Sequence, residues 1–365
     1  MNLTALRETL DHDGPFASVL MDASHDTEDA AKMAELRWRA IRDELAAQDV
    51  PDKTLHALDD AIDRRPPAGR SGRLLVAADG SVLVDEYLPE PPPRRDVRVS
   101  ALPYLLPLAA WSRRTVPHVV VVVDRVGADL RAVAADGTVR TEDVAGQNHP
   151  IRKVRGGGWS HRTVQRRAEE TVRRNLGEVA DEVAALVRGV DAHLLVLAGD
   201  AQARAQLREL LPRHCQRITA EIEHSRRVDP GHDTIDRDIT ELLAEQRRTE
   251  HCRLLERVDA AREHKLAARG LPDTTAALRD GNVEVLLIDT RELADSLVWT
   301  GSEPAMVAVD REDLHRVGVS ERRHARADEA LPAAAIAVGA DIVAATGDEP
   351  PLELTNGVGA LLRHD

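Results

Sequence analysis

The chain has 365 residues, of which 42% are apolar and 2% aromatic, and its formal net charge is −14 at pH 7. A chain of this length predicts two or three domains of about 100–200 residues each. So few aromatic rings argue against a protein that binds single strands by extensive base stacking. The acidic excess argues against general coating of nucleic acid, including DNA. One basic surface remains compatible with RNA contact, because salt screens surface charges beyond about 10 Å.

Cysteine usage and the N-terminus indicate a cytoplasmic protein. Cys215 and Cys252 are the only cysteines, and their spacing fits no common zinc site. Two thiols in a chain this long suit a reducing compartment. The N-terminus, MNLTALRETLDHDG, lacks the apolar stretch of a signal peptide. The apolar run Val119–Val123 is too short to cross a bilayer. We therefore predict no membrane contact.

Residues 1–115 are predicted to form a first domain of mixed α and β structure. Apolar side chains recur at helical spacing over Thr27–Ala47. A second helix is expected over Lys53–Ile62. Asp79-Gly80 is a pair that tight hairpins favour, and two strands are expected on either side of it, Arg73–Ala77 and Val82–Tyr87.

Residues 116–228 are predicted to form a second domain. His118–Val123 and His193–Ala198 are continuous apolar runs, as in strands that are buried on both faces. Between them come a second hairpin signal and a long helix, roughly Val164–Val187, with apolar side chains at spacings of three and four. Asp200 is placed to cap a following helix. This order of elements predicts a mixed sheet with helices packed on it.

Residues 229–365 are predicted to form a third domain. A charged helix is expected over Asp236–Arg269, and another over Ala327–Val338 with Gly339 as its C-terminal stop. The expected strands are Val283–Asp289, Met306–Val309, Asp341–Ala345 and Val358–Leu362. Alternating helices and strands predict a small layered α/β domain.

The most unusual segment reads IRKVRGGGWSHRTVQRRAEETVRRN, from Ile151 to Asn175. Residues 152–174 hold eight Lys or Arg and two Glu, so the local charge is +6 within a chain of −14. Three glycines let the backbone approach a partner closely. A glycine-rich tip beside a basic helix start suits contact with phosphates. The candidate RNA-binding residues are Arg152, Lys153, Arg155, Gly156, Gly157, Gly158, Trp159, Ser160, Arg162, Arg166, Arg167, Arg173 and Arg174.

A flexible loop followed by a solvated amphipathic helix would explain the same pattern without any ligand. Three consecutive glycines match neither the Walker motif nor GxGxxG. Trp159 favours the binding interpretation, because a bulky apolar side chain directly after glycines is either packed against its own domain or offered to a partner.

Two groups of acidic residues are candidates for other chemistry. Asp124 and Asp200 stand at strand ends, but a metal-dependent nuclease needs several converging carboxylates, so capping and loop roles are expected. The second group is explained by N-capping of a helix and comprises Asp229, His232, Asp233 and Asp236. We predict no catalytic residue, no metal and no cofactor.

The glycine segment resembles a loop of the class-one release factors of archaea and eukaryotes, in which Gly-Gly-Gln-Ser precedes an arginine-rich helix. Here Gly157-Gly158, Trp159 and Ser160 stand at those positions, with Trp in place of Gln, and Arg155 and Arg166 flank them. Domain order and the C-terminal NGVGALLRHD agree with that family.

The whole chain therefore resembles the bacterial relatives of these factors, most closely the actinobacterial branch that includes the ribosome hibernation factor Balon. Residues 14–32, GPFASVLMDASHDTEDAAK, look typical of that branch. The resemblance implies a three-domain, release-factor-like α/β architecture. Its middle domain would have a ribonuclease H-like mixed sheet and its C-terminal domain a layered α/β fold.

The resemblance implies binding to the rRNA of the 70S ribosome, with the first domain near the decoding region, and delivery with elongation factor Tu. In release factors the Gln positions water at the ester bond, whereas Trp159 offers only one indole donor and no carbonyl acceptor. We therefore predict a hibernation factor that occupies the vacant A site during stress and extends the glycine segment toward the peptidyl-transferase centre without peptide release.

Two other functions remain open at this point. A rescue enzyme that acts on peptidyl-tRNA in stalled complexes is the main alternative, and Trp159 counts against it. A stress-induced binding protein with no ribosomal role is the third, because the acidic net charge fits rRNA binding poorly.

Overall fold

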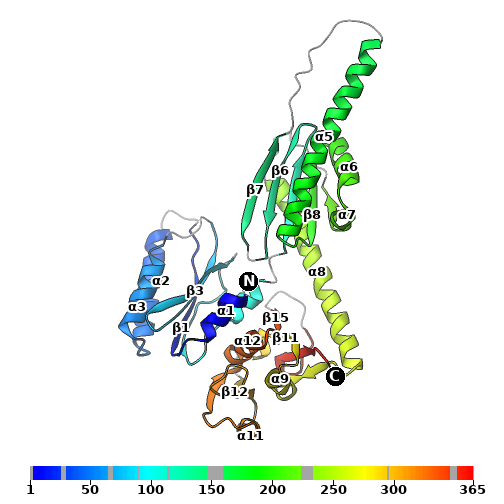
Figure 1. The fold of residues 1–365 in the computed structure, drawn as a ribbon. Coiled ribbons are helices and arrows are strands. Elements are labelled where there is room, and N and C mark those ends of the chain that lie inside the picture. The colour runs from blue at the N-terminus through cyan, green and yellow to red at the C-terminus, as the bar shows by residue number, and fades with distance from the viewer. Residues whose placement is uncertain are drawn as a thin grey trace. The chain divides into compact units, whose positions relative to one another are not determined.

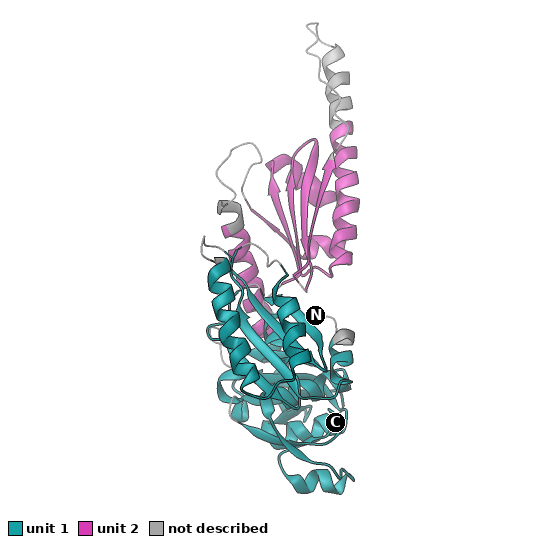
Figure 2. Ribbon diagram, turned by 90° about the vertical axis from the view of Figure 1, so that its left-hand side faces the viewer, with its two compact units in different colours: residues 1–113, 254–365 teal, residues 114–253 magenta. Residues whose placement is uncertain are grey.

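The structure is a computed structural model of an α/β protein with four sheets (Figure 1). It describes residues 3–25, 30–64, 69–88, 90–112, 116–135, 137–145, 159–222, 233–293, 296–345 and 352–364. Contacts group the chain into two compact units, residues 1–113 with 254–365, and residues 114–253 (Figure 2). The division into domains 1–115, 116–228 and 229–365 stays a prediction.

The N-terminal part of the first unit is an antiparallel sheet in the order β3-β2-β1-β4. Its strands are β1 (Phe16–Asp22), β2 (Gly72–Ala78), β3 (Ser81–Leu88) and β4 (Asp96–Ser100). The predicted hairpin between β2 and β3 is confirmed, and both of its turn residues, Asp79 and Gly80, have positive φ. Strands β1 and β4 were not predicted from the sequence.

The two predicted helices of this part are confirmed as α2 (Ala30–Ala46) and α3 (Asp52–Ile62), and they cover one face of the sheet (Figure 1). The other face packs into a core shared with the C-terminal residues. Alternate residues of β2 divide between these cores: Leu75 faces the helices, whereas Leu74 and Val76 face the shared core. Two short helices join the shared core, α1 (Leu3–Leu10) and α4 (Leu106–Ser112).

The C-terminal residues form a second sheet in the order β10-β16-β11-β15, in which β11 and β15 run parallel. The strands are β10 (Ala267–Arg269), β11 (Val283–Asp289), β15 (Asp341–Ala345) and β16 (Val358–Leu362). Helices α9 (Gly270–Arg279) and α12 (Ala327–Val338) pack in the shared core. Gly339 ends α12 in the left-handed conformation, as predicted.

A third, small sheet has the order β13-β12-β14. It consists of β12 (Leu297–Thr300), β13 (Val307–Ala308) and β14 (Arg323–Arg326). The short helices nearby are α10 (Thr290–Leu293), α11 (Arg311–Arg316) and the 3₁₀ turn η1 (Thr355–Gly357).

The helix predicted over residues 236–269 is wrong at its C-terminal end. Helix α8 spans Asp233–Glu263, and β10 and α9 follow it. Lys265 has a φ of 59°, which a continuing α-helix does not allow, and residues 267–269 pair with β16.

The second unit is built on a mixed sheet in the order β7-β6-β5-β8-β9. Strands β5, β6 and β7 form an antiparallel meander, and β8 and β9 continue parallel to β5. The predicted mixed sheet is confirmed. The strands are β5 (His118–Val123), β6 (Gly127–Val133), β7 (Val139–Ala145), β8 (Leu194–Gly199) and β9 (Thr219–Glu221).

Helices cover both faces of this sheet. Helices α5 (Trp159–Gly189), α6 (Ala201–Leu210) and α7 (Arg213–Arg217) lie on one side. The first half of α8 covers the other side through Ile239, Leu242 and Leu243. Both faces are therefore buried, which explains why β5 and β8 read as continuous apolar runs.

Candidate nucleic-acid interface

The candidate segment divides at the start of helix α5, which begins at Trp159 directly after the glycine triplet. Six candidate residues lie outside the described residues: Arg152, Lys153, Arg155, Gly156, Gly157 and Gly158. For Trp159, Ser160, Arg162, Arg166 and Arg167 the structure gives a position on the helix backbone and no side-chain surroundings. Arg173 and Arg174 are fully described.

Helix α5 has 31 residues, and its C-terminal half packs on the sheet. From Glu170 onward, where its side chains are described, Val172 is the first that contacts the core, and Leu176, Val179 and Val183 are fully buried. Thirteen residues separate Trp159 from Val172, which is about 20 Å of helix. The glycine triplet therefore directly precedes a long helix.

The two described arginines of the segment face solvent. Arg173 and Arg174 are exposed, and they lie off the apolar stripe of the helix. Arg174 forms an ion pair with Glu178 at 3.5 Å, and both side chains are at least half exposed. An exposed pair of this kind contributes only about 0.3–0.5 kcal/mol, so Arg174 can exchange it for a phosphate contact at little cost.

Charge changes sign along α5. The basic residues gather before residue 175, whereas Glu178, Asp181 and Glu182 follow on the part that packs on the sheet. A hydrogen bond and repulsion between Glu142 and Glu182 raise the pKa of Glu182. The positive charge of the helix is thus concentrated at the end that adjoins the glycines.

The carboxylates at the strand ends are engaged in local structure. Asp124 accepts hydrogen bonds from the backbone N–H of Val126 (2.7 Å) and Gly127 (2.9 Å). Asp200 caps α6 by accepting from the N–H of Ala203 at 3.0 Å. The predicted loop and capping roles are confirmed. Of the second acidic group, Asp229 and His232 lie outside the described residues.

The glycine that joins β8 to α6 is a feature that sequence reasoning missed. Gly199 has a φ of 108°, and a Cβ there would lie 2.0 Å from the carbonyl oxygen of Val123. Only glycine allows this approach of the two parallel strands.

Metal ligands and thiols offer no further site in the part of the chain that the structure describes. No group of three or more His, Cys, Asp or Glu side chains is arranged to hold a metal ion there. Burial raises the pKa of the Cys215 thiol, whereas Cys252 is exposed. Among the described helices, none combines the length and apolarity that a membrane span requires.

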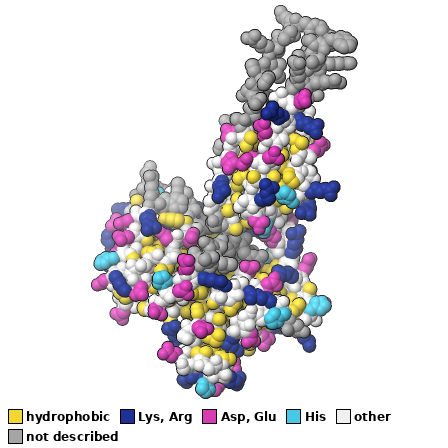
Figure 3. Space-filling view, viewed as in Figure 1, with side chains coloured by type: hydrophobic (Ala, Val, Ile, Leu, Met, Phe, Trp, Pro, Cys, Tyr) yellow, Lys and Arg dark blue, Asp and Glu magenta, His cyan; other side chains and the backbone are white. Residues whose placement is uncertain are grey.

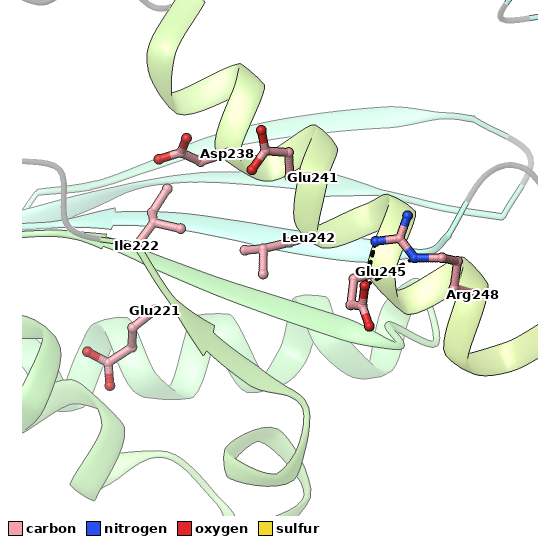
Figure 4. Close-up of a pocket in the computed structure, with 7 residues that line it drawn as sticks. All are labelled: Glu221, Ile222, Asp238, Glu241, Leu242, Glu245 and Arg248. Carbon is pink, nitrogen blue, oxygen red and sulfur yellow. Dashed lines mark hydrogen bonds and ion pairs between the residues drawn. The ribbon is translucent and has the colours of Figure 1, made fainter.

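A hollow of about 470 Å³ lies beside the first turns of α8 (Figure 4). Its apolar lining is Ile222 and Leu242, and Arg248 bonds to Glu245. The remaining lining is acidic, with Glu221, Asp238, Glu241 and Glu245. A lining with this charge repels phosphates, so the hollow is no part of a nucleic-acid interface.

Comparison with known proteins supplies the family. The family model for bacterial archaeo-eukaryotic release factor family 2 matches residues 117–264. The Mycobacterium tuberculosis protein Rv2629 is 36% identical over 373 residues, which cover 100% of this chain and 97% of the relative. Its counterpart in a second M. tuberculosis strain is equally similar. The chain belongs to the bacterial archaeo-eukaryotic release factor family.

The family match coincides with structural boundaries. It begins one residue before β5 and ends one residue after α8, so it contains the mixed sheet, the candidate segment and the helix behind the sheet.

Solved structures with similarity over most of the chain include an archaeal Pelota and a yeast translation termination-like factor. Archaeoglobus fulgidus Pelota is 15% identical, with a TM-score of 0.36, over 100% of this chain and 92% of that one. Saccharomyces cerevisiae Dom34 is 9% identical, with a TM-score of 0.40, over 99% and 92%.

Proposed function

We propose that this release factor family protein is a cytoplasmic translation factor that binds the 70S ribosome and holds it inactive. It would occupy the vacant A site and extend residues 155–160 toward the peptidyl-transferase centre, without releasing peptide. The observation that carries the proposal is the geometry of α5. A 31-residue helix that begins directly after the glycine triplet, with about 20 Å of helix between Trp159 and Val172, suits delivery of that tip into a narrow site.

The charge of the segment supports an RNA partner. Residues 152–174 carry a net charge of +6, and Arg173 and Arg174 are exposed. Elsewhere, on the face shown in Figure 3, basic and acidic side chains are interspersed over both units. Binding through the segment would release counterions from RNA phosphates and would therefore weaken steeply with salt.

Trp159 supports inhibition over hydrolysis. It stands at the family's Gln position and starts the helix, where an indole cannot provide the carbonyl acceptor that a Gln side chain offers. A protein that reaches the peptidyl-transferase centre with this residue would exclude other ligands from it. The proposal also includes membership of the actinobacterial hibernation branch and delivery with elongation factor Tu. Both of these parts rest on the resemblance alone.

A paired assay tests the proposal. Purified protein is added to ribosomes that carry labelled peptidyl-tRNA, and to a separate translation reaction. We expect inhibition of translation and no release of peptide above the spontaneous rate. Peptide release that is lost when Gly157 and Gly158 are both replaced by Val would instead establish a rescue enzyme.

A further inference from the structure

The small sheet β13-β12-β14 buries one face and leaves the other partly open. Val298 and Val307 belong to the shared core, and Ala325 packs against it. Side chains alternate along strands, so Leu297 and Trp299 lie on the opposite, outer face. His324 pairs directly with Trp299 across β12 and β14 and shares that face. Leu297 is 56% exposed, and Trp299 is half-buried.

Trp299 is the centre of a cluster of planar side chains. The imidazole of His324 lies 3.7 Å from the Trp299 ring, measured between centroids. The guanidinium of Arg311, from α11, lies 5.6 Å from the same ring. His324 and Arg311 are both exposed. Guanidinium and imidazole planes are surfaces on which nucleobases stack.

The cluster carries a positive charge that no carboxylate of the described residues neutralises, whereas a nearby arginine of the same helix is paired with an acid. Arg311 has no carboxylate partner in the described part of the chain, and the adjacent Glu312 points to a different side of the helix. Arg316, five residues further along, pairs with Asp313 at 2.7 Å. The strands contain no acid at all, since they read LVWT, VA and RHAR.

Further cations stand at the entrance to β14. Arg322 also lacks an ion pair among the described residues, whereas Arg323 pairs with Thr300 and lies on the opposite face. Arg326, at the other end, is paired with Asp328 at 3.1 Å. A face with free planar groups, unpaired guanidiniums and no carboxylate on its strands is complementary to a single nucleic-acid strand.

We propose that the outer face of this small sheet binds a single-stranded segment of RNA. Bases would stack on His324, Trp299 and Arg311, and phosphates would contact Arg322. The choice of RNA rests on the proposed ribosomal function. The surface would be a second RNA contact, remote in sequence from residues 152–174.

Fluorescence anisotropy of the full chain with a labelled oligouridylate of about twelve nucleotides tests this directly. Arg311→Ala and His324→Ala are each expected to weaken binding about fivefold or more, because one stacked base is lost. Arg316→Ala is the matched control, since it removes the same charge from the same helix, away from Trp299, and a change below about twofold is expected. Equal effects of Arg311→Ala and Arg316→Ala, or no binding of the oligonucleotide, would overturn the proposal.

Ribosome sedimentation of the same variants separates this inference from the proposed function. Oligouridylate binding that depends on Arg311, in a protein that never sediments with ribosomes, would support the RNA surface and contradict the ribosomal role. Ribosome binding that is unchanged in Arg311→Ala but weakened by Leu297→Ala would make the surface a protein contact and overturn the RNA proposal.

Discussion

The junction between β4 and α12 and the basic segment of helix α5 use arginine in opposite ways. At the junction, Arg98 is 13% exposed and donates to Asp96, Asp328 and Glu329, with its guanidinium 3.5 Å from the centroid of the Tyr104 ring. In that segment, the described arginines, Arg173 and Arg174, are exposed, and of the two only Arg174 has an ion pair, with Glu178. A buried arginine with three carboxylate partners holds the fold together, whereas exposed arginines with at most one such partner are available for a contact outside the fold.

The surroundings of Arg98 show how strongly the junction depends on it. Glu329 is 2% exposed, and burial raises its pKa. Burial also raises the pKa of Tyr104 to about 12. These groups are costly to bury unless a cation compensates them.

The largest expected effect of a single substitution is therefore on stability, in Arg98→Met. Methionine keeps the length of the side chain and removes the charge, which leaves Asp328 and Glu329 buried without it. We expect a loss of about 3–5 kcal/mol in the free energy of unfolding, measured by urea denaturation. Arg39→Met is the control, because Arg39 pairs with Glu35 on an exposed helix surface. A change below about 0.5 kcal/mol in the free energy of unfolding is expected for this control. Equal losses in the two variants would contradict the difference between the buried and the exposed arginine.

The second prediction concerns the basic segment of helix α5. Arg166→Glu combined with Arg167→Glu should weaken ribosome binding at least about tenfold at low salt, because two phosphate contacts become repulsive. The melting temperature of the double variant should equal that of the wild type. Arg188→Glu, an exposed position in the last turn of the same helix, is the matched control. If this control weakens binding as much as the double variant, net charge and not the helix start governs the interaction.

The third prediction separates binding from inhibition. Gly157→Val and Gly158→Val should leave ribosome binding within about threefold and reduce translational arrest, because a β-branched side chain resists positive φ and prevents close backbone approach. Binding is measured by filter retention and arrest by protein synthesis in a cell-free reaction. Full arrest in both variants would mean that the glycine tip plays no part.

Local signals explain what could be predicted from the sequence. Apolar runs, the Asp79-Gly80 pair and the stop at Gly339 each act within a few residues, and the structure has the expected elements there. The apolar stripe of α5 predicted its buried side, and the arginines off the stripe are exposed.

What the sequence did not predict depends on contacts between distant residues. Strand β1 lies between β2 and β4 in the sheet, and its partner residues in both strands are far away in the sequence. The partners of Arg98 lie 230 and 231 positions away. The cluster around Trp299 forms only when β12, β14 and α11 come together. No pattern within a short window contains these pairings.

The smallest expected effect is a pH dependence in the first unit. Hydrogen bonds from Arg291 lower the pKa of Asp289 below its ordinary value of 3.8. The ionised form therefore stabilises the fold above that value, and this contribution is lost as pH falls through the lowered pKa. Asp289→Asn should cost about 1–2 kcal/mol at pH 7, and the difference from wild type should shrink below about pH 4. A difference that stays constant between pH 7 and pH 3 would show that the charge of Asp289 is irrelevant.

The most direct test of ribosome binding is sucrose-gradient sedimentation of the purified protein with vacant 70S ribosomes at low and raised salt. We predict that the protein migrates with the ribosomes at low salt, that raised salt removes it, and that the Arg166→Glu, Arg167→Glu variant stays at the top of the gradient. Wild-type protein that stays at the top at low salt, both with purified ribosomes and in extracts of growing and starved cells, would contradict the ribosomal function.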